Sequence, residues 1–203
     1  MRLIGMLDSP YVRRVAISLN FVGIPFVHEP VSVFRNYDTF AAANPVVKAP
    51  TLVTDDGITL MDSTLILDYL DRLAPPDRRL TPDTIAAFVH SQRILGLALA
   101  ACDKSVQLVY EHTLRPPERQ HQPWIDRVRG QLRSAYRLLE SEVGSGSAWL
   151  IAARPLQADI STAVAWHFTQ SVLADLIAPA EHPALFTFSK RAEALPEFLA
   201  WTP

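Results

Sequence analysis

Three short segments combine polar side chains with places where a helix or strand is expected to begin. In the first, Asp8-Ser9-Pro10, a serine stands between a short apolar run, Arg2–Met6, and an apolar helical pattern. The N-terminus of a helix has unpaired N–H groups and a positive dipole end, so it favours an anion. A purely structural role is the alternative, in which Ser9 caps the helix and Pro10 occupies its first position.

The second and third segments precede a strand and a helix. Pro50 ends the segment Asn44–Pro50 (NPVVKAP). A cis bond before Pro50 would turn the N–H and C=O of Ala49 outward, toward an extended peptide. Asp62-Ser63 stands at the start of a helix predicted over 64–73, a position typical of a helix cap.

The residues around these segments predict alternating strands and helices. Apolar spacing from Tyr11 to Leu19 predicts a helix, and Gly23 stands where a left-handed helix end is expected. Asp55-Asp56-Gly57 is a hairpin turn signal between strands over 51–53 and 58–60. With a further strand over 26–33, the predicted order is strand, helix, strand, loop, two hairpin strands and helix.

The composition changes at Ala74–Asp83 (APPDRRLTPD), where prolines interrupt any helix, and we expect the domain linker there. Beyond it the sequence predicts helices over 84–113, 123–143 and 157–178, with a turn over 144–147. The last of these helices is apolar on nearly every side, so it should form the buried centre of a bundle. The predicted domains are residues 1–76 and 84–203.

The composition also excludes several classes of protein. Among the 203 residues, 19 Lys and Arg stand against 21 Asp and Glu, which gives no overall field for nucleic acid or an anionic membrane. The longest weakly charged stretch, 94–101, is shorter than the ~18 residues that span a bilayer, and the first ten residues are too polar for a signal peptide. The single cysteine, Cys102, excludes an internal disulfide, and the histidines show no metal-ligand spacing. We expect a cytoplasmic protein with no metal, nucleic-acid or membrane partner.

With its three polar segments and its helical second half, the chain resembles the glutathione transferase superfamily, in particular its cytosolic, bacterial, serine-type members. The resemblance rests on motifs in the family's order: SPYVRR from Ser9, NPVVKAP from Asn44, MDSTLILDYL from Met61 and LQADIS from Leu156. It implies a fold class of α/β plus all-α. An N-terminal thioredoxin-like domain with a mixed four-stranded sheet would precede an all-helical C-terminal domain.

The resemblance also implies roles for residues of the N-terminal domain. Ser9 would donate a hydrogen bond to the sulfur of glutathione and stabilise its thiolate. The backbone of Ala49, before a cis Pro50, would pair with the cysteinyl unit, and Lys48 would either meet the glycyl carboxylate or remain a solvated loop charge. Asp62-Ser63 would hold the ammonium and the carboxylate of the γ-glutamyl end.

Three positions depart from the family pattern. Asp62 replaces a glutamate and Val47 replaces a glycine, although both changes keep the charge or backbone group that a contact needs. Leu156 replaces the Ser or Thr that stands three residues before Asp159. Asp159 can still accept N–H bonds at its helix start, so we expect it to be a structural residue.

The electrophile pocket is expected on the N-terminal loop and on the first helix of the second domain. The candidate lining residues are Tyr11, Leu97, Ala101, Ser105, Leu108 and Trp166. For each of them, packing in the core is the alternative role. We expect Cys102 to be a small buried hydrophobe, and Arg13 and Arg14 to be surface or packing residues rather than ligands.

The resemblance implies a glutathione transferase that conjugates reduced glutathione, its co-substrate, to small apolar electrophiles in detoxification. Disulfide exchange is excluded at the first loop, because Ser9 and Val12 replace the two thiols of the redox relatives. A glutathione-dependent isomerase or dehalogenase of the same fold, and a non-catalytic binding or regulatory protein, are the alternatives. The resemblance also implies a homodimer in which the first domain of one subunit packs on the helical domain of the other.

Overall fold

The structure is a computed structural model that describes residues 1–144 and 148–203. These residues form two compact units, one of Met1–Thr81 with Ala194–Pro203 and the other of Pro82–Glu193. Apart from Gly144, the turn predicted over 144–147 lies outside the described residues.

The first unit contains a mixed four-stranded sheet with the strand order β2-β1-β3-β4. β1 pairs in parallel with β2 and antiparallel with β3, and β3 pairs antiparallel with β4. The strands are β1 (Arg2–Ile4), β2 (Val27–Glu29), β3 (Thr51–Val53) and β4 (Thr59–Met61). The mixed four-stranded sheet that the family resemblance implies is therefore confirmed.

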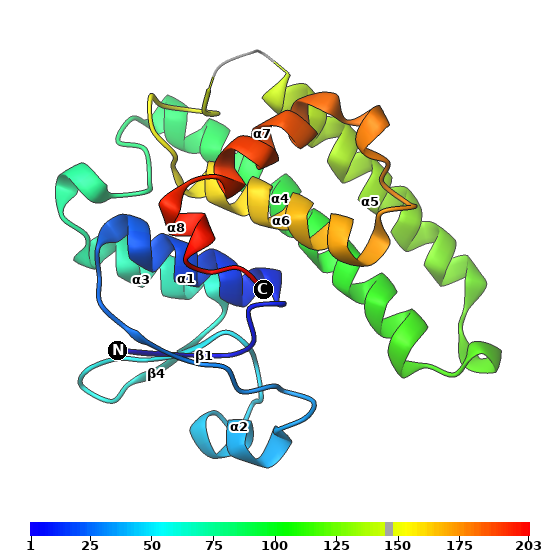
Figure 1. Ribbon diagram of the computed structural model, residues 1–203, viewed down its shortest axis with the longest axis horizontal. Coiled ribbons are helices and arrows are strands. Elements are labelled where there is room, and N and C mark those ends of the chain that lie inside the picture. Colours follow the sequence, from blue (N-terminus) through cyan, green and yellow to red (C-terminus); the bar gives the residue numbers. More distant parts are fainter. Residues whose placement is uncertain (145–147) are drawn as a thin grey trace. The chain divides into compact units, whose positions relative to one another are not determined.

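Two helices cover one face of this sheet, and a third lies on the other face (Figure 1). α1 (Pro10–Val22) and α3 (Ser63–Leu73) contact each other. Their apolar sides form a buried core with strand residues, which includes Leu3, Val15, Leu19, Leu52, Ile66 and Leu70. α1 ends as predicted at Gly23, whose φ of +73° places it in the left-handed region that glycine tolerates.

The sequence predicts a loop where the structure has α2 (Tyr37–Ala43). Only Phe40 of this seven-residue helix is buried. A segment with one buried side chain has no repeating apolar pattern, so the periodicity that identifies longer helices is missing here.

The last ten residues pack with the first unit rather than with the helical domain to which we assigned them. This segment contains the short helix α8 (Pro196–Leu199). Phe198 meets Phe21 edge to face with 6.3 Å between ring centroids, and Trp201 lies 4.9 Å from Phe26. Aromatic pairs at such distances are stabilising, which accounts for the position of the segment.

The second unit is helical in its described residues. Its longer helices are α4 (Ile85–Leu114), α5 (Gln122–Val143), α6 (Gln157–Leu173) and α7 (Pro183–Glu193). α4 packs against both α5 and α6, and α6 is buried over Gln157–Trp166. The first part of α6 is therefore buried as predicted, whereas Val172 near its end is 40% exposed.

The sequence places the end of α6 at 178 and does not predict α7 or α8. α6 ends at Leu173, and both unpredicted helices begin with a proline, Pro183 and Pro196. Proline interrupts a helix but is well tolerated in its first turn, so a residue taken as a breaker is here the first residue of a helix.

α4 also bears on the expected absence of a membrane-spanning stretch. It contains an 18-residue window with mean hydropathy 1.5 and few charges, so by length and composition alone it could cross a membrane. Its buried residues, such as Ile94, Ala98 and Leu108, recur at helical spacing. α4 packs against two neighbouring helices, and 33% of the apolar window is buried inside the structure.

Asp159 organises the start of α6. Its side chain is 1% exposed, and it accepts the backbone N–H groups of Leu150 at 2.8 Å and Leu156 at 2.9 Å. Burial raises the pKa of Asp159 to about 6, although the backbone N–H donors oppose that change. These contacts support the structural role expected for Asp159.

The raised pKa gives a pH dependence of folding. Between about pH 4 and pH 6, folded Asp159 holds a proton that the unfolded chain has lost, so stability is full below about pH 4 and falls as the pH rises through about 6. The loss is on the order of 3 kcal/mol. Asp159→Asn removes this slope, and urea unfolding of both proteins from pH 4 to pH 7 measures it. Parallel stability curves for the two proteins would contradict the assignment.

Candidate functional site

Strand pairing gathers the three polar segments at one edge of the sheet. Ile4 at the end of β1 pairs with Thr51 at the start of β3, and Thr51 pairs with Met61 at the end of β4. The loop before α1, the loop before β3 and the start of α3 therefore leave the sheet at the same edge.

A close backbone approach joins the first two loops. Gly5 has a φ of +142°, and a Cβ atom there would lie 2.6 Å from Cγ2 of Val12 and 3.3 Å from Cβ of Ala49. Only glycine fits this conformation and this space. Ala49 thus lies against the beginning of the loop that carries Ser9.

Ser9 occupies the N-cap position of α1, but its hydroxyl does not cap the helix. Its backbone is extended, its carbonyl accepts the N–H of Arg13, and its side chain makes no capping hydrogen bond. Pro10 occupies the first helical position as predicted. The side-chain capping interpretation is therefore wrong, and Ser9 is a partly exposed residue at a helix N-terminus.

Buried hydrogen bonds hold the loop before β3, in which the Ala49–Pro50 bond is cis. Asn44 is 2% exposed, donates to Oγ1 of Thr51 at 2.8 Å and accepts the N–H of Val46 at 3.0 Å. Thr51 in turn donates from Oγ1 to the carbonyl of Lys48 at 2.8 Å. This chain of bonds fixes the loop on both sides of the cis bond.

Asp62 caps α3 and lies beside Lys48. Its Oδ1 accepts the N–H of Thr64 at 2.9 Å, and its Oδ2 lies 3.4 Å from Nζ of Lys48. Burial would raise the pKa of Asp62, but the Thr64 N–H bond and the Lys48 charge outweigh it and hold the pKa below its ordinary value. Asp62 is therefore a carboxylate at neutral pH, suited to an ammonium group.

Ser63 is 4% exposed and receives a hydrogen bond from Nη1 of Arg14 at 3.3 Å. Arg13 and Arg14 are 1% and 2% exposed. The sequence allows either a surface position or a packed position for these arginines. The packed position is confirmed, and the surface position is wrong.

The candidates for an electrophile pocket in the helical unit are mostly buried. Ala101, Ser105, Leu108 and Trp166 are each at most 3% exposed. Ser105 Oγ lies 2.8 Å from Oγ1 of Thr169, and the Trp166 ring meets Tyr136 edge to face. Ser105 and Trp166 thus make contacts inside this unit, as the core-packing alternative requires.

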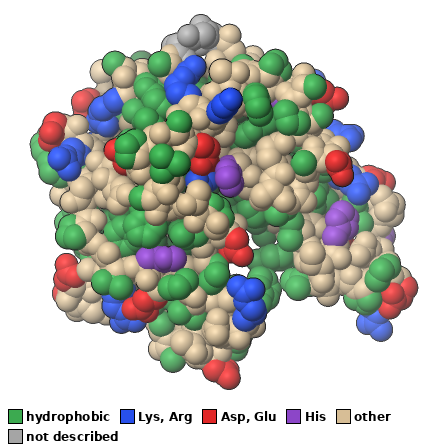
Figure 2. Space-filling model, viewed as in Figure 1, with side chains coloured by type: hydrophobic (Ala, Val, Ile, Leu, Met, Phe, Trp, Pro, Cys, Tyr) green, Lys and Arg blue, Asp and Glu red, His purple; other side chains and the backbone are tan. Residues whose placement is uncertain are grey.

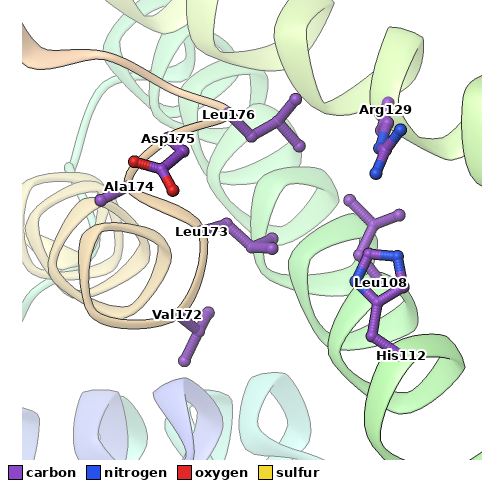
Figure 3. A pocket seen from close by; sticks show the side chains of 8 residues that line it. All are labelled: Leu108, His112, Arg129, Val172, Leu173, Ala174, Asp175 and Leu176. Atoms are coloured by element: carbon purple, nitrogen blue, oxygen red, sulfur yellow. The ribbon is translucent and has the colours of Figure 1, made fainter.

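Leu97, on α4, and Tyr11, at the start of α1 in the first unit, are partly exposed. Leu108 also lines a hollow of about 310 Å³ with His112, Arg129 and residues 172–176 (Figure 3). This hollow lies between α4, α5 and the end of α6.

The described residues do not offer a metal site, since no group of three or more His, Cys, Asp or Glu side chains is placed to hold an ion among them. Cys102 is buried, as predicted. On the face drawn in Figure 2, acidic and basic side chains are interspersed among hydrophobic ones.

Comparison with known proteins identifies the family. The description "Glutathione S-transferase, N-terminal domain" matches residues 3–78, and "Glutathione S-transferase, C-terminal domain" matches residues 122–201. A glutathione transferase family member from Pseudomonas fluorescens with bound S-(propanoic acid)-glutathione is 30% identical, with a TM-score of 0.86 over 100% of this chain and 98% of that one. The chain belongs to the glutathione S-transferase superfamily.

Two further relatives match 79% or more of this chain. A glutathione S-transferase from Methylobacterium radiotolerans in complex with glutathione sulfonate is 28% identical, with a TM-score of 0.92 over 100% of this chain and 94% of that one. Maleylacetoacetate isomerase from Pseudomonas aeruginosa is 28% identical over 171 residues, which are 79% of this chain and 77% of the relative. The expected thioredoxin-like domain followed by a helical domain is confirmed by these matches.

Three residues that organise the site were not identified from the sequence. Gly5 lies inside the run Arg2–Met6 from which the first strand was predicted, and Asn44 precedes a proline, so both had a local signal. Arg14 had no local signal, because the sequence alone does not distinguish a buried arginine from an exposed one.

The backbone conformation of Val47 is expected to lower the free energy of unfolding. It replaces the family's glycine and has a φ of +53°, which costs a β-branched residue about 1–2 kcal/mol. Val47→Gly should raise the free energy of unfolding by about 1 kcal/mol, after the higher backbone entropy of unfolded glycine is subtracted.

Val46→Gly is the matched control, since Val46 is 63% exposed and is not among the positive-φ residues. It should lower the free energy of unfolding by about 0.5–1 kcal/mol. Urea unfolding at one protein concentration compares the variants. Equal destabilisation by both glycines would refute strain at Val47.

Proposed function

We propose that this protein is a glutathione transferase that binds reduced glutathione and transfers its sulfur to small apolar electrophiles. The observation that carries the proposal is the gathering of Ser9, the cis Ala49–Pro50 bond and Asp62-Ser63 at one sheet edge. The two relatives whose structures contain glutathione derivatives support it.

Each part of the tripeptide has a matching group. The N–H and C=O of Ala49 would pair with the cysteinyl backbone in the manner of an added strand. The Asp62 carboxylate would receive the γ-glutamyl ammonium, and Ser63 with the N-terminus of α3 would receive the adjoining carboxylate. Lys48 would have to leave its ion pair with Asp62 to meet the glycyl carboxylate at the other end of the tripeptide.

Ser9 would act on the sulfur. A free thiol with a pKa of ~8.5 is only a few per cent ionised at pH 7, and lowering that pKa by ~2 units requires ~2.7 kcal/mol. A hydroxyl that donates to an anion contributes about 1.5–3 kcal/mol, and a helix N-terminus adds up to about 1 kcal/mol. The thiolate then forms a bond to an electrophilic carbon, whose leaving group departs with its electron pair, while the thiol proton goes to solvent.

Glutathione-dependent isomerisation is the second candidate, because maleylacetoacetate isomerase is among the relatives. It uses the same thiolate but regenerates glutathione after turnover. Parallel assays with an aryl halide and a maleyl-type acid distinguish the reactions, since only conjugation consumes glutathione. Turnover of neither substrate, with glutathione bound, would favour a binding protein.

Ser9→Ala tests the proposed role of the hydroxyl. The conjugation rate at pH 7 should fall about 10- to 100-fold, and the pH–rate profile should move to higher pH, because the thiolate has lost its donor. The glutathione Kd should change less than about threefold, since the carboxylate and backbone contacts remain.

The free energy of unfolding should stay within about 0.5 kcal/mol of the parent, because Ser9 is not a side-chain cap. Thr187→Ala, which removes an exposed hydroxyl from α7, is the matched control and should leave the rate unchanged. An unaltered pH–rate profile in Ser9→Ala would exclude Ser9 from thiolate stabilisation.

We also propose that the protein is a cytoplasmic homodimer that acts in detoxification. Ile85 and Val89 are 78% and 60% exposed and lie one turn apart on α4, which supports an apolar contact with a second subunit. Light scattering at micromolar concentration should give about twice the chain mass of 22.6 kDa. Val89→Glu should shift the population to monomer, and a monomeric parent protein would contradict the dimer.

A further inference from the structure

Arg14 is a buried cation that the proposed mechanism does not use. It lies on α1 and is 2% exposed. Its Nη1 lies 3.3 Å from Oγ of Ser63 and 3.5 Å from Oγ1 of Thr64, so it reaches from α1 to the first turn of α3. A buried arginine is uncommon, and this one stands behind a residue that we place in the ligand site.

The direction of this hydrogen bond has a chemical consequence. A guanidinium group has N–H donors and no acceptor, so the Ser63 oxygen accepts and its own hydrogen cannot point at Arg14. A hydroxyl that accepts from a cation is polarised and becomes a stronger donor.

We propose that Arg14 is a positioning residue that turns the Ser63 hydroxyl into a dedicated donor for the γ-glutamyl carboxylate. This inference rests on the proposed glutathione site and assigns recognition of one ligand group to a residue that does not need to touch it. Its specific prediction is that Arg14 affects binding only through that carboxylate.

Arg13 provides a matched comparison. It is the adjacent residue of α1 and is 1% exposed, but it donates from Nε to the carbonyl of Trp201 at 2.9 Å and lies 5.8 Å from the Phe198 ring centroid. Arg13 therefore stabilises the C-terminal segment, and its loss should affect any ligand of the site equally.

The experiment compares two ligands by calorimetric titration of the full chain. One is reduced glutathione, and the other is 4-aminobutanoyl-cysteinylglycine, which lacks only the γ-glutamyl carboxylate. Arg14→Met should weaken glutathione binding about tenfold and change the Kd of the analogue less than twofold. Arg13→Met should change both Kd values by the same factor.

Ser63→Ala completes a double-mutant cycle. If Arg14 acts through Ser63, the double variant should bind glutathione no more weakly than Ser63→Ala alone. Arg14→Lys, which keeps the charge with fewer donors, should lie between the parent and Arg14→Met and serves if the latter does not fold.

Equal losses of affinity for the two ligands in the Arg14 variants, or additive effects in the cycle, would overturn the positioning role while leaving the glutathione site intact. A parent protein that does not bind glutathione would instead overturn the proposed function, and the positioning role with it.

Discussion

The pairing of β3 with a strand on each side is the constraint on which the site depends. Because Thr51 stands between Ile4 and Met61, three segments that are far apart in the sequence leave the sheet together. A shift of one residue in either pairing would turn the buried Leu52 outward and separate these segments. The register that buries the core is therefore the register that assembles the site.

Buried polar side chains then fix what the register has brought together. Asn44 and Thr51 hold the loop before β3, and Arg14 holds the start of α3. Each of these groups would be costly to bury without a partner, so each contact limits its loop to one conformation. Preorganised donors and acceptors bind a ligand without a further ordering cost, which suits a small flexible tripeptide.

Much of this arrangement could be predicted from the sequence, because periodicity and turn chemistry are local. The α1 pattern, its Gly23 end and the Asp-Gly hairpin all matched the structure. The short α2 was not predicted, since one buried phenylalanine gives no period. α7 and α8 were missed because their first prolines look like breakers. The Arg14–Ser63 contact joins residues 49 positions apart, and no local pattern could reveal it.

We propose that one sheet edge of the first unit forms a glutathione site. Amide chemical shifts of the 15N-labelled chain, recorded during titration with reduced glutathione, test this most directly. A glutathione site at this edge should give saturable shifts for Ser9, Ala49 and Ser63 with one common Kd. Saturable shifts confined to Pro82–Glu193, or no saturable shifts at all, would contradict it.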